Sequence, residues 1–188
     1  MNAPWRKFLA GLVIALSIPA TTALAQTDAP ETEMQAPQAE VRGQYQDWIV
    51  RCQPAPEDAF GAGELCEMYQ SVSESENGQT VFEVVIGYPQ GAESPIALFN
   101  LPLGIRLPPG VQLQVDDNER FSFPIQTCIT TGCRGFIALD QGLETQMRSG
   151  AEAVLIIADP QEDRGLALPP LSLSGFSASL NEVEASRP

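Results

Sequence analysis

An alternation of apolar and polar residues constrains the fold of this chain more than any other feature. Apolar side chains occupy every second position on both sides of a Pro-Pro-Gly break: Leu101, Leu103, Ile105 and Leu107 before it, and Val111, Leu113 and Val115 after it. A period of two is typical of half-buried β-strands, and Pro and Gly favour turns. The stretch therefore predicts two strands joined by a turn at residues 108–110. It contains no nucleophile, acid–base pair or phosphate-binding loop.

The first 25 residues have the three parts of a secretory signal peptide. A basic segment at residues 5–7 precedes an apolar segment at residues 8–18, and an Ala-x-Ala motif ends at Ala25. The apolar segment is shorter than the roughly 20 residues that a bilayer span needs, and Pro19 follows it. We expect export, cleavage after Ala25 and no membrane span in the mature protein. That places the protein in the periplasm or, alternatively, outside the cell or at its outer surface.

The composition excludes several classes of function. The net charge is -14, and it moves to about -16 when cleavage removes Arg6 and Lys7. A field of this sign repels nucleic acid. The chain has no histidine and no lysine after Lys7, so the mature protein lacks the commonest general base, the commonest zinc ligand and any Schiff-base nucleophile. We expect no cofactor, no metal and no nucleic-acid partner.

The chain after the signal peptide divides into a tail and one domain. Residues 26–43 are rich in Pro, Ala and acid, which predicts a disordered leader. Residues 44–188 are enough for one domain with a single core. Strands are expected at 44–52, 66–72, 81–88, 96–107, 111–115, 121–128, 134–139, 153–158 and 171–177.

One segment has a different period. Leu139, Leu143 and Met147 recur every four residues between Asp140, a possible N-cap, and Gly150, a possible C-cap. This predicts one short helix, and a second short helix is expected at residues 178–183. Many short strands with one or two short helices indicate an all-β fold, an antiparallel β-sandwich. A closed barrel is the alternative.

Four cysteines in an exported chain predict two disulfides, for which three pairings are possible. Local pairing is favoured, because Cys128 and Cys133 are separated by the length of a hairpin loop. Cys52 and Cys66 likewise flank an acidic loop between adjacent predicted strands. A bridge that closes a loop of about 15 residues stabilises by roughly 3 kcal/mol. A redox-active pair is the alternative, but neither pair has the Cys-x-x-Cys spacing of oxidoreductases.

The acidic clusters are candidate sites with weaker patterns. The run Asp116, Asp117, Asn118 and Glu119 offers oxygen ligands, but it lacks the glycine and the spacing of a calcium loop and favours a solvated turn. Two loops could each supply a carboxylate pair for hydrolysis, one with Glu57, Asp58 and Glu64 and the other with Asp159, Glu162 and Asp163. Clusters this close in sequence are usually solvated charge.

Serine and arginine candidates are weaker still. Ser172, Ser174 and Ser177 have neither a histidine nor a Gly-x-Ser-x-Gly elbow to activate them, which argues against a serine hydrolase. Four arginines that could bind an anion are spread along the chain and favour ordinary surface: Arg106, Arg120, Arg134 and Arg148.

Several short motifs occur in an order that resembles the invasion-associated locus B family of exported bacterial proteins. They are Asp47-Trp48-Ile49-Val50-Arg51-Cys52, Cys66, Leu101-Pro102-Leu103-Gly104-Ile105 with Leu107, Gly110-Val111, Val115-Asp116, Cys128, Gly132-Cys133 and Leu171-Ser172-Leu173-Ser174-Gly175-Phe176. The resemblance covers about residues 44–182. It implies an immunoglobulin-like β-sandwich in a Gram-negative envelope and a link to host-cell invasion, but no active site. The loops at residues 53–64 and 159–168 have no family signature.

These observations favour a non-enzymatic exported module that binds a protein partner in the envelope or at the cell surface, through loops or an exposed strand edge. The alternative is a carboxylate-dependent hydrolase of a cell-envelope polymer. A thiol oxidoreductase that uses Cys128 and Cys133 is a third hypothesis.

Overall fold

The computed structural model describes residues 39–55, 63–74, 78–159, 161 and 164–187. They belong to one compact unit, Gln35–Pro188. The predicted signal peptide and leader residues 26–38 lie outside the described ranges. Neither helix within these ranges is long and apolar enough to cross a membrane.

Seven of the described strands form one antiparallel sheet in the order β1-β2-β3-β4-β5-β9-β8, called the large sheet below. Its strands are β1 (Glu40–Tyr45), β2 (Trp48–Pro54), β3 (Glu64–Ser73), β4 (Thr80–Gly87), β5 (Ile96–Leu101), β9 (Gly132–Ala138) and β8 (Ile125–Ile129). The first five follow the order of the chain, and the hairpin of β8 and β9 adds to β5.

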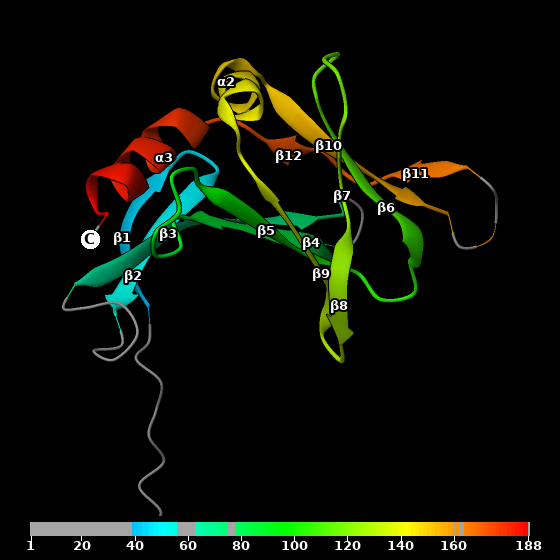
Figure 1. The fold of residues 1–188 in the computed structure, drawn as a ribbon, viewed down its shortest axis with the longest axis horizontal. Helices are drawn as coiled ribbons and strands as arrows, with labels where there is room; N and C mark the ends of the chain where they lie inside the picture. Colours follow the sequence, from blue (N-terminus) through cyan, green and yellow to red (C-terminus); the bar gives the residue numbers. More distant parts are fainter. Residues whose placement is uncertain (1–38, 56–62, 75–77, 160, 162–163, 188) are drawn as a thin grey trace, which may run out of the picture. The chain divides into compact units, whose positions relative to one another are not determined.

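The small sheet has the order β11-β10-β6-β7, with β12 paired to β10. Its strands are β6 (Arg106–Val115), β7 (Phe121–Phe123), β10 (Glu152–Ala158), β11 (Gly165–Ala167) and β12 (Leu171–Ser172). Pro124 separates β7 from β8, where the chain passes from the small sheet to the large one (Figure 1). Both sheets are open. The β-sandwich prediction is therefore confirmed, and the closed-barrel alternative is wrong.

The core lies between the two sheets and beneath helix α3 (Phe176–Ala185). Phe99 of β5 stacks on Phe123 of β7 with 5.3 Å between ring centroids, which joins the sheets directly. Trp48, fully buried on β2, meets Phe176 of α3 edge-on at 5.4 Å. One face of each sheet is thus covered, as the alternating sequence predicts.

Helix α2 (Gln141–Ser149) confirms the predicted helix and both of its end residues. The Asp140 carboxylate accepts a hydrogen bond from the Leu143 amide at 2.9 Å, which caps the first turn. Leu143 and Met147 lie four residues apart on one face and are fully buried. Gly150 follows the helix at a position with no room for a side chain. A β-carbon there would lie 2.5 Å from Cγ1 of Val115.

The predicted leader extends too far into the domain, because residues 40–43 form the first part of β1. Their amides and carbonyls pair with β2, where Val41 lies opposite Arg51. Arg42 also forms an ion pair with Glu64 of β3. An edge strand held by backbone bonds and charge needs few apolar side chains, which is why its composition resembles a tail.

The Pro-Pro-Gly segment is not the predicted hairpin turn. Strand β6 passes through it, and the four residues 107–110 bulge out between the pairs Arg106–Ala158 and Val111–Ile157. Prolines lack the amide that a ladder bond requires, so the pairing breaks at this point without ending the strand.

Gly110 fits this bulge for a conformational reason. Its φ is 94°, and a β-carbon there would lie 2.5 Å from the carbonyl oxygen of Phe123. The chain reverses earlier, at residues 102–105, so Leu103 and Leu107 are exposed instead of contributing to a strand core.

The last predicted strand is also shorter than expected. Residues 171–177 were expected to be extended, but β12 ends at Ser172 and α3 begins at Phe176. Gly175 has φ 89°, a left-handed conformation that turns the chain into the helix. The second predicted helix is confirmed, two residues longer at each end than expected.

Candidate interaction site

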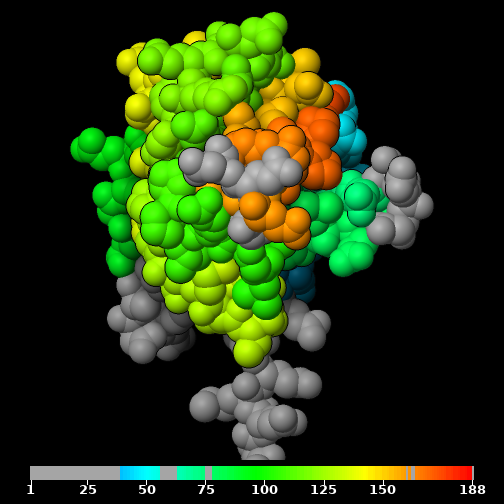
Figure 2. Space-filling model, turned by 90° about the vertical axis from the view of Figure 1, so that its right-hand side faces the viewer, coloured from blue at the N-terminus to red at the C-terminus, as the bar shows by residue number. Residues whose placement is uncertain are grey.

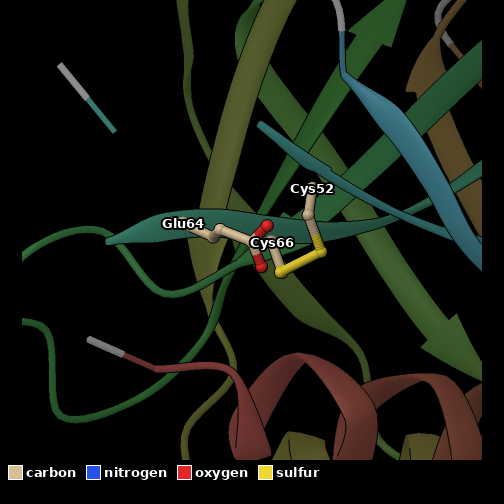
Figure 3. A group of neighbouring side chains, drawn as sticks. All are labelled: Cys52, Glu64 and Cys66. Atoms are coloured by element: carbon tan, nitrogen blue, oxygen red, sulfur yellow. A yellow bond between two sulfur atoms is a disulfide. The ribbon is translucent and has the colours of Figure 1, made fainter. Parts of the chain in front are cut away.

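Two disulfides link neighbouring strands, and they are the local pairs favoured by the sequence. Cys52 and Cys66 lie directly opposite each other on β2 and β3, with 4.1 Å between their α-carbons (Figure 3). Cys128 and Cys133 do the same on β8 and β9, at 3.9 Å. No cysteine is free.

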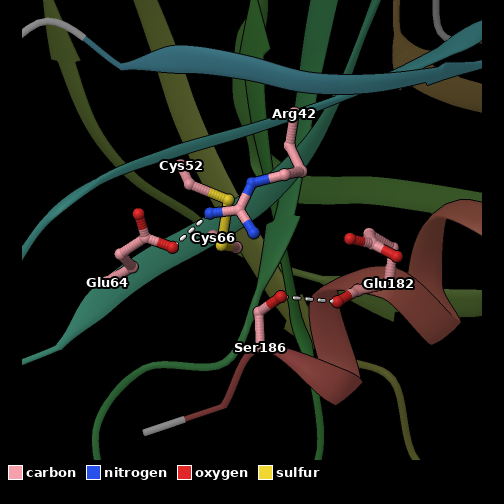
Figure 4. Close-up of a disulfide and its surroundings, with 6 residues drawn as sticks. All are labelled: Arg42, Cys52, Glu64, Cys66, Glu182 and Ser186. Atoms are coloured by element: carbon pink, nitrogen blue, oxygen red, sulfur yellow. Dashed lines mark hydrogen bonds and ion pairs between the residues drawn. A yellow bond between two sulfur atoms is a disulfide. The ribbon is translucent and has the colours of Figure 1, made fainter.

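Glu64 lies beside the Cys52–Cys66 bridge, and these three residues are the one group among the described residues that could resemble a metal site. The two sulfur atoms are bonded to each other, and the Glu64 carboxylate is paired with Arg42 (Figure 4). Metal ligation requires thiolates, which this bridge does not offer. Neither bridge lies at a helix N-terminus, so the geometry gives the oxidoreductase hypothesis no support.

Removing the two bridges should destabilise the protein unequally. Replacing Cys52 and Cys66 with alanine should lower the free energy of unfolding by about 3 kcal/mol, because their bridge closes a loop with a sequence separation of 14. The same change at Cys128 and Cys133, with a separation of 5, should lower it by about 2 kcal/mol. Urea unfolding of the mature protein measures both values. A larger loss for the second pair would contradict the loop-entropy explanation.

Where the structure describes them, members of the predicted acidic clusters bind backbone amides or arginines and form no catalytic pair. Asp116 orders the backbone, because its carboxylate accepts hydrogen bonds from the amides of Ala151 and Glu152 at 3.1 to 3.2 Å. Asp159 accepts one from the Gln161 amide and pairs with Arg164 at 3.5 Å. The other members of the two loop clusters, Glu57, Asp58, Glu162 and Asp163, lie outside the described residues.

The turn at residues 116–119 has the solvated character expected from the sequence. Asp117 and Glu119 are exposed, and the Asn118 amide donates to the Val115 carbonyl at 2.9 Å. This hydrogen bond closes the turn.

The serine candidates connect elements of the fold. Ser172 donates a hydrogen bond to the Asp47 carboxylate at 2.6 Å, and Ser174 bonds to Gln46. Ser177 donates to the Arg148 carbonyl at 3.1 Å, which ties α3 to α2. A serine needs a general base to become a nucleophile, and the chain contains no histidine to serve as one.

The four candidate arginines are dispersed, as expected. Arg148 bonds to Glu144 and to Asn181 in α3, and Arg120 bonds to Gln112 and Gln114. Arg134 is exposed on β9. Arg106 lines a hollow of about 370 Å³ on the small sheet together with Arg164. Figure 2 shows this side of the domain, where residues of β11 (orange) and of β6 (green) reach the surface, and β10 lies between these two strands in the sheet.

The strongest candidate site is a row of apolar side chains on the outer face of the large sheet, the face turned away from the core. Cross-strand pairing places five residues in line across β2, β3, β4, β5 and β9: Ile49, Tyr69, Val85, Leu98 and Phe136. We call this row the outer stripe. The first four are half-buried, and Phe136 is 47% exposed. A sheet face turned to water normally carries polar residues at such positions, so the stripe is a candidate contact surface.

Polar side chains hold Tyr69, the second residue of the outer stripe, in place. The Tyr69 hydroxyl donates to Glu83 at 2.6 Å, and the Arg51 guanidinium lies 4.7 Å from the Tyr69 ring centroid. Arg51 also pairs with Glu67 at 2.7 Å. Burial and, second, the hydrogen bond to Glu83 raise the pKa of Tyr69. The tyrosine is thus neutral and fixed at neutral pH, as suits a preorganised contact.

A hollow of about 270 Å³ opens beside the stripe at Gly87, called the Gly87 hollow below. Gly87 lies between Glu67 and Ile96 in the next row of the sheet and contributes no side chain. Val85 and Leu98 of the stripe border the hollow. The hollow is therefore a mostly apolar recess at the end of β4, and Gln53, Glu67 and Gln90 are the polar residues of its lining.

The sequence predictions missed this face, although a signal for it exists. Val84-Val85-Ile86 and Ile96-Ala97-Leu98-Phe99 are continuous apolar runs, without the alternation of the other strands. Such runs are typical of strands that are covered on both faces. From the sequence, partner binding is expected in loops or at an exposed strand edge. Much of the two loops, at residues 53–64 and 159–168, lies outside the described residues.

Fold and bridges define the chain as a small disulfide-bridged antiparallel β-sandwich protein. The family model for "Invasion associated locus B (IalB) protein" matches residues 48–184. The chain therefore belongs to the invasion-associated locus B family, which confirms the resemblance drawn from its motifs.

Curated relatives and a solved structure agree with this membership. An invasion protein B homolog of Brucella abortus (strain 2308) is 26% identical over 164 residues, which cover 87% of this chain and 91% of the relative. The homolog of Brucella abortus biovar 1 (strain 9-941) matches equally. The crystal structure of invasion associated protein B from Bartonella henselae superposes with a TM-score of 0.65 at 22% identity, covering 79% of this chain and 96% of that one. The last comparison shows a shared fold.

Proposed function

We propose that this protein is an exported, non-enzymatic module of the bacterial envelope that binds a protein partner through the outer face of its large sheet. One observation carries the proposal: five adjacent strands present apolar side chains in a line on the face opposite the core. Water-facing sheets of soluble domains rarely do so without a partner. The signal-peptide pattern supports export to the periplasm or the cell surface.

The described residues support binding better than catalysis. The carboxylates of Asp116, Asp159 and Glu64 are engaged with backbone amides or arginines. The relatives are named for invasion. For the present chain, the proposed role is a binding step in the envelope or at the bacterial surface that contacts a host cell.

In-cell photocrosslinking tests the proposal. A photoreactive residue replacing Leu98 should capture one discrete, identifiable protein, because this position lies within the outer stripe, between Val85 and Phe136. The same residue replacing Ser122, exposed on the small sheet, should not capture that protein. Equal capture at both positions would contradict a role for the outer face. Turnover of an envelope polymer by the purified protein, lost on changing one carboxylate, would contradict the non-enzymatic assignment.

A further inference from the structure

The outer face carries a projecting side chain and a recess that can receive one. Phe136 on β9 is 47% exposed, among the most exposed large apolar side chains of the described residues. The Gly87 hollow of about 270 Å³ lies on the same face. For comparison, an apolar cavity of about 150 Å³ holds a benzene molecule. The hollow is therefore large enough for a phenylalanine ring.

Register fixes the separation of these two features. Phe136 pairs with Leu98 on β5 and Leu98 with Val85 on β4, while Gly87 lies two residues farther along β4. At ordinary sheet spacings, this places Phe136 and Gly87 about 10 Å apart across the strands and about 7 Å apart along them. A projection and a recess on one face make that face complementary to itself under a two-fold rotation.

The distribution of charge on this face also favours contact between two copies of the chain. The row of the sheet on one side of the outer stripe carries Arg51 and Glu67, and the row on the other side carries Glu83 and Arg134. Each row thus has one charge of each sign, in a chain whose net charge is -14. Two copies of an acidic protein repel each other over most of their surfaces, and they do so least where charge is balanced.

From these observations we infer that the outer face binds a second copy of this chain, with Phe136 of each copy in the Gly87 hollow of the other. This inference rests on the proposed function, since it names the partner of the same face. The contact is isologous, so each projection and each recess is used once per copy. An aromatic side chain that enters a pocket near the centre of an interface carries much of its binding energy.

Sedimentation equilibrium of the mature, disulfide-bonded protein over a roughly hundredfold concentration range tests the inference. We expect a monomer–dimer equilibrium whose dissociation constant rises about tenfold or more in Phe136→Ala. Leu166→Ala is the matched control, because Leu166 is an exposed apolar residue on the small sheet, and it should leave the constant unchanged. Circular dichroism checks that each variant is folded.

Two further variants test the recess. Gly87→Leu fills the hollow and should weaken the dimer as Phe136→Ala does. Cysteine trapping tests the same contact with a smaller side chain at position 87. A mixture of Phe136→Cys and Gly87→Cys proteins should form a disulfide-linked heterodimer. A mixture of Leu166→Cys and Gly87→Cys proteins should not.

A protein that stays monomeric, or a dimer insensitive to Phe136→Ala, would overturn the inference. If photocrosslinking at Leu98 then captured a different protein, the proposed function would stand and only the second copy would be excluded as the partner. If it captured nothing, both would be excluded.

Discussion

Replacing Gly175 with alanine should lower the free energy of unfolding by about 4 kcal/mol, enough to unfold a marginal domain. Gly175 has φ 89°, a conformation that costs an L-residue about 1 to 2 kcal/mol. An added β-carbon would also collide with the Tyr45 carbonyl, lying 2.7 Å from its carbon atom. Relief of this overlap would separate α3 from the turn between β1 and β2, and overpacking of this kind costs about 1 to 3 kcal/mol.

Gly104 provides the matched control for Gly175. Its φ is 85°, but a β-carbon there would meet nothing within 4 Å. Gly104→Ala should therefore cost only the conformational part, about 1 to 2 kcal/mol. Urea denaturation of both variants, followed by circular dichroism, separates the two contributions. Equal losses would show that the close approach of Gly175 to Tyr45 contributes nothing.

Replacing Trp48 with alanine should lower the free energy of unfolding by about 4 kcal/mol. Trp48 is fully buried and packs edge-on against Phe176, so truncation opens a cavity between the large sheet and α3. It also removes the hydrogen bond from its Nε1 to the Ser172 carbonyl, 3.0 Å long. That bond and the two hydrogen bonds between Gln70 and Ser172 together hold β12 against the large sheet.

Exposed apolar side chains should behave differently from Trp48. Leu166→Ala, on edge strand β11, should change the free energy of unfolding by no more than about 0.5 kcal/mol, because Leu166 already contacts water. Denaturant unfolding with circular dichroism as the probe avoids dependence on the tryptophan that is removed. A small loss for Trp48→Ala would mean that the sandwich closes around the cavity and that Trp48 is not its anchor.

Local sequence patterns correctly predicted much of the architecture. The alternation of Trp48, Val50 and Cys52 was enough to predict an inward face, and Asp140 with Gly150 marked both ends of α2. The two cysteine pairs lie close in sequence, and each joins strands that are hairpin neighbours. These features depend on residues within a few turns or one hairpin of each other, so they can be predicted from the sequence.

Other features depend on residues that are distant in the chain. Residues 107–110 form a bulge in β6 because β10, some 45 residues later, pairs on both sides of them. Gly175 needs to be glycine because Tyr45, far earlier in the sequence, lies against it. Neither partner is visible in the local pattern.

The sequence by itself determined the β-sandwich class, the first helix with its caps and the family to which the chain belongs. Only the tertiary structure decided that Ile49, Tyr69, Val85, Leu98 and Phe136 form one outer stripe, and that Gly87 leaves a hollow beside it. The physical reason is register: each strand's own period sets which side chains share a face, but the pairing of five strands sets which of them meet. The candidate interaction site is a product of that pairing.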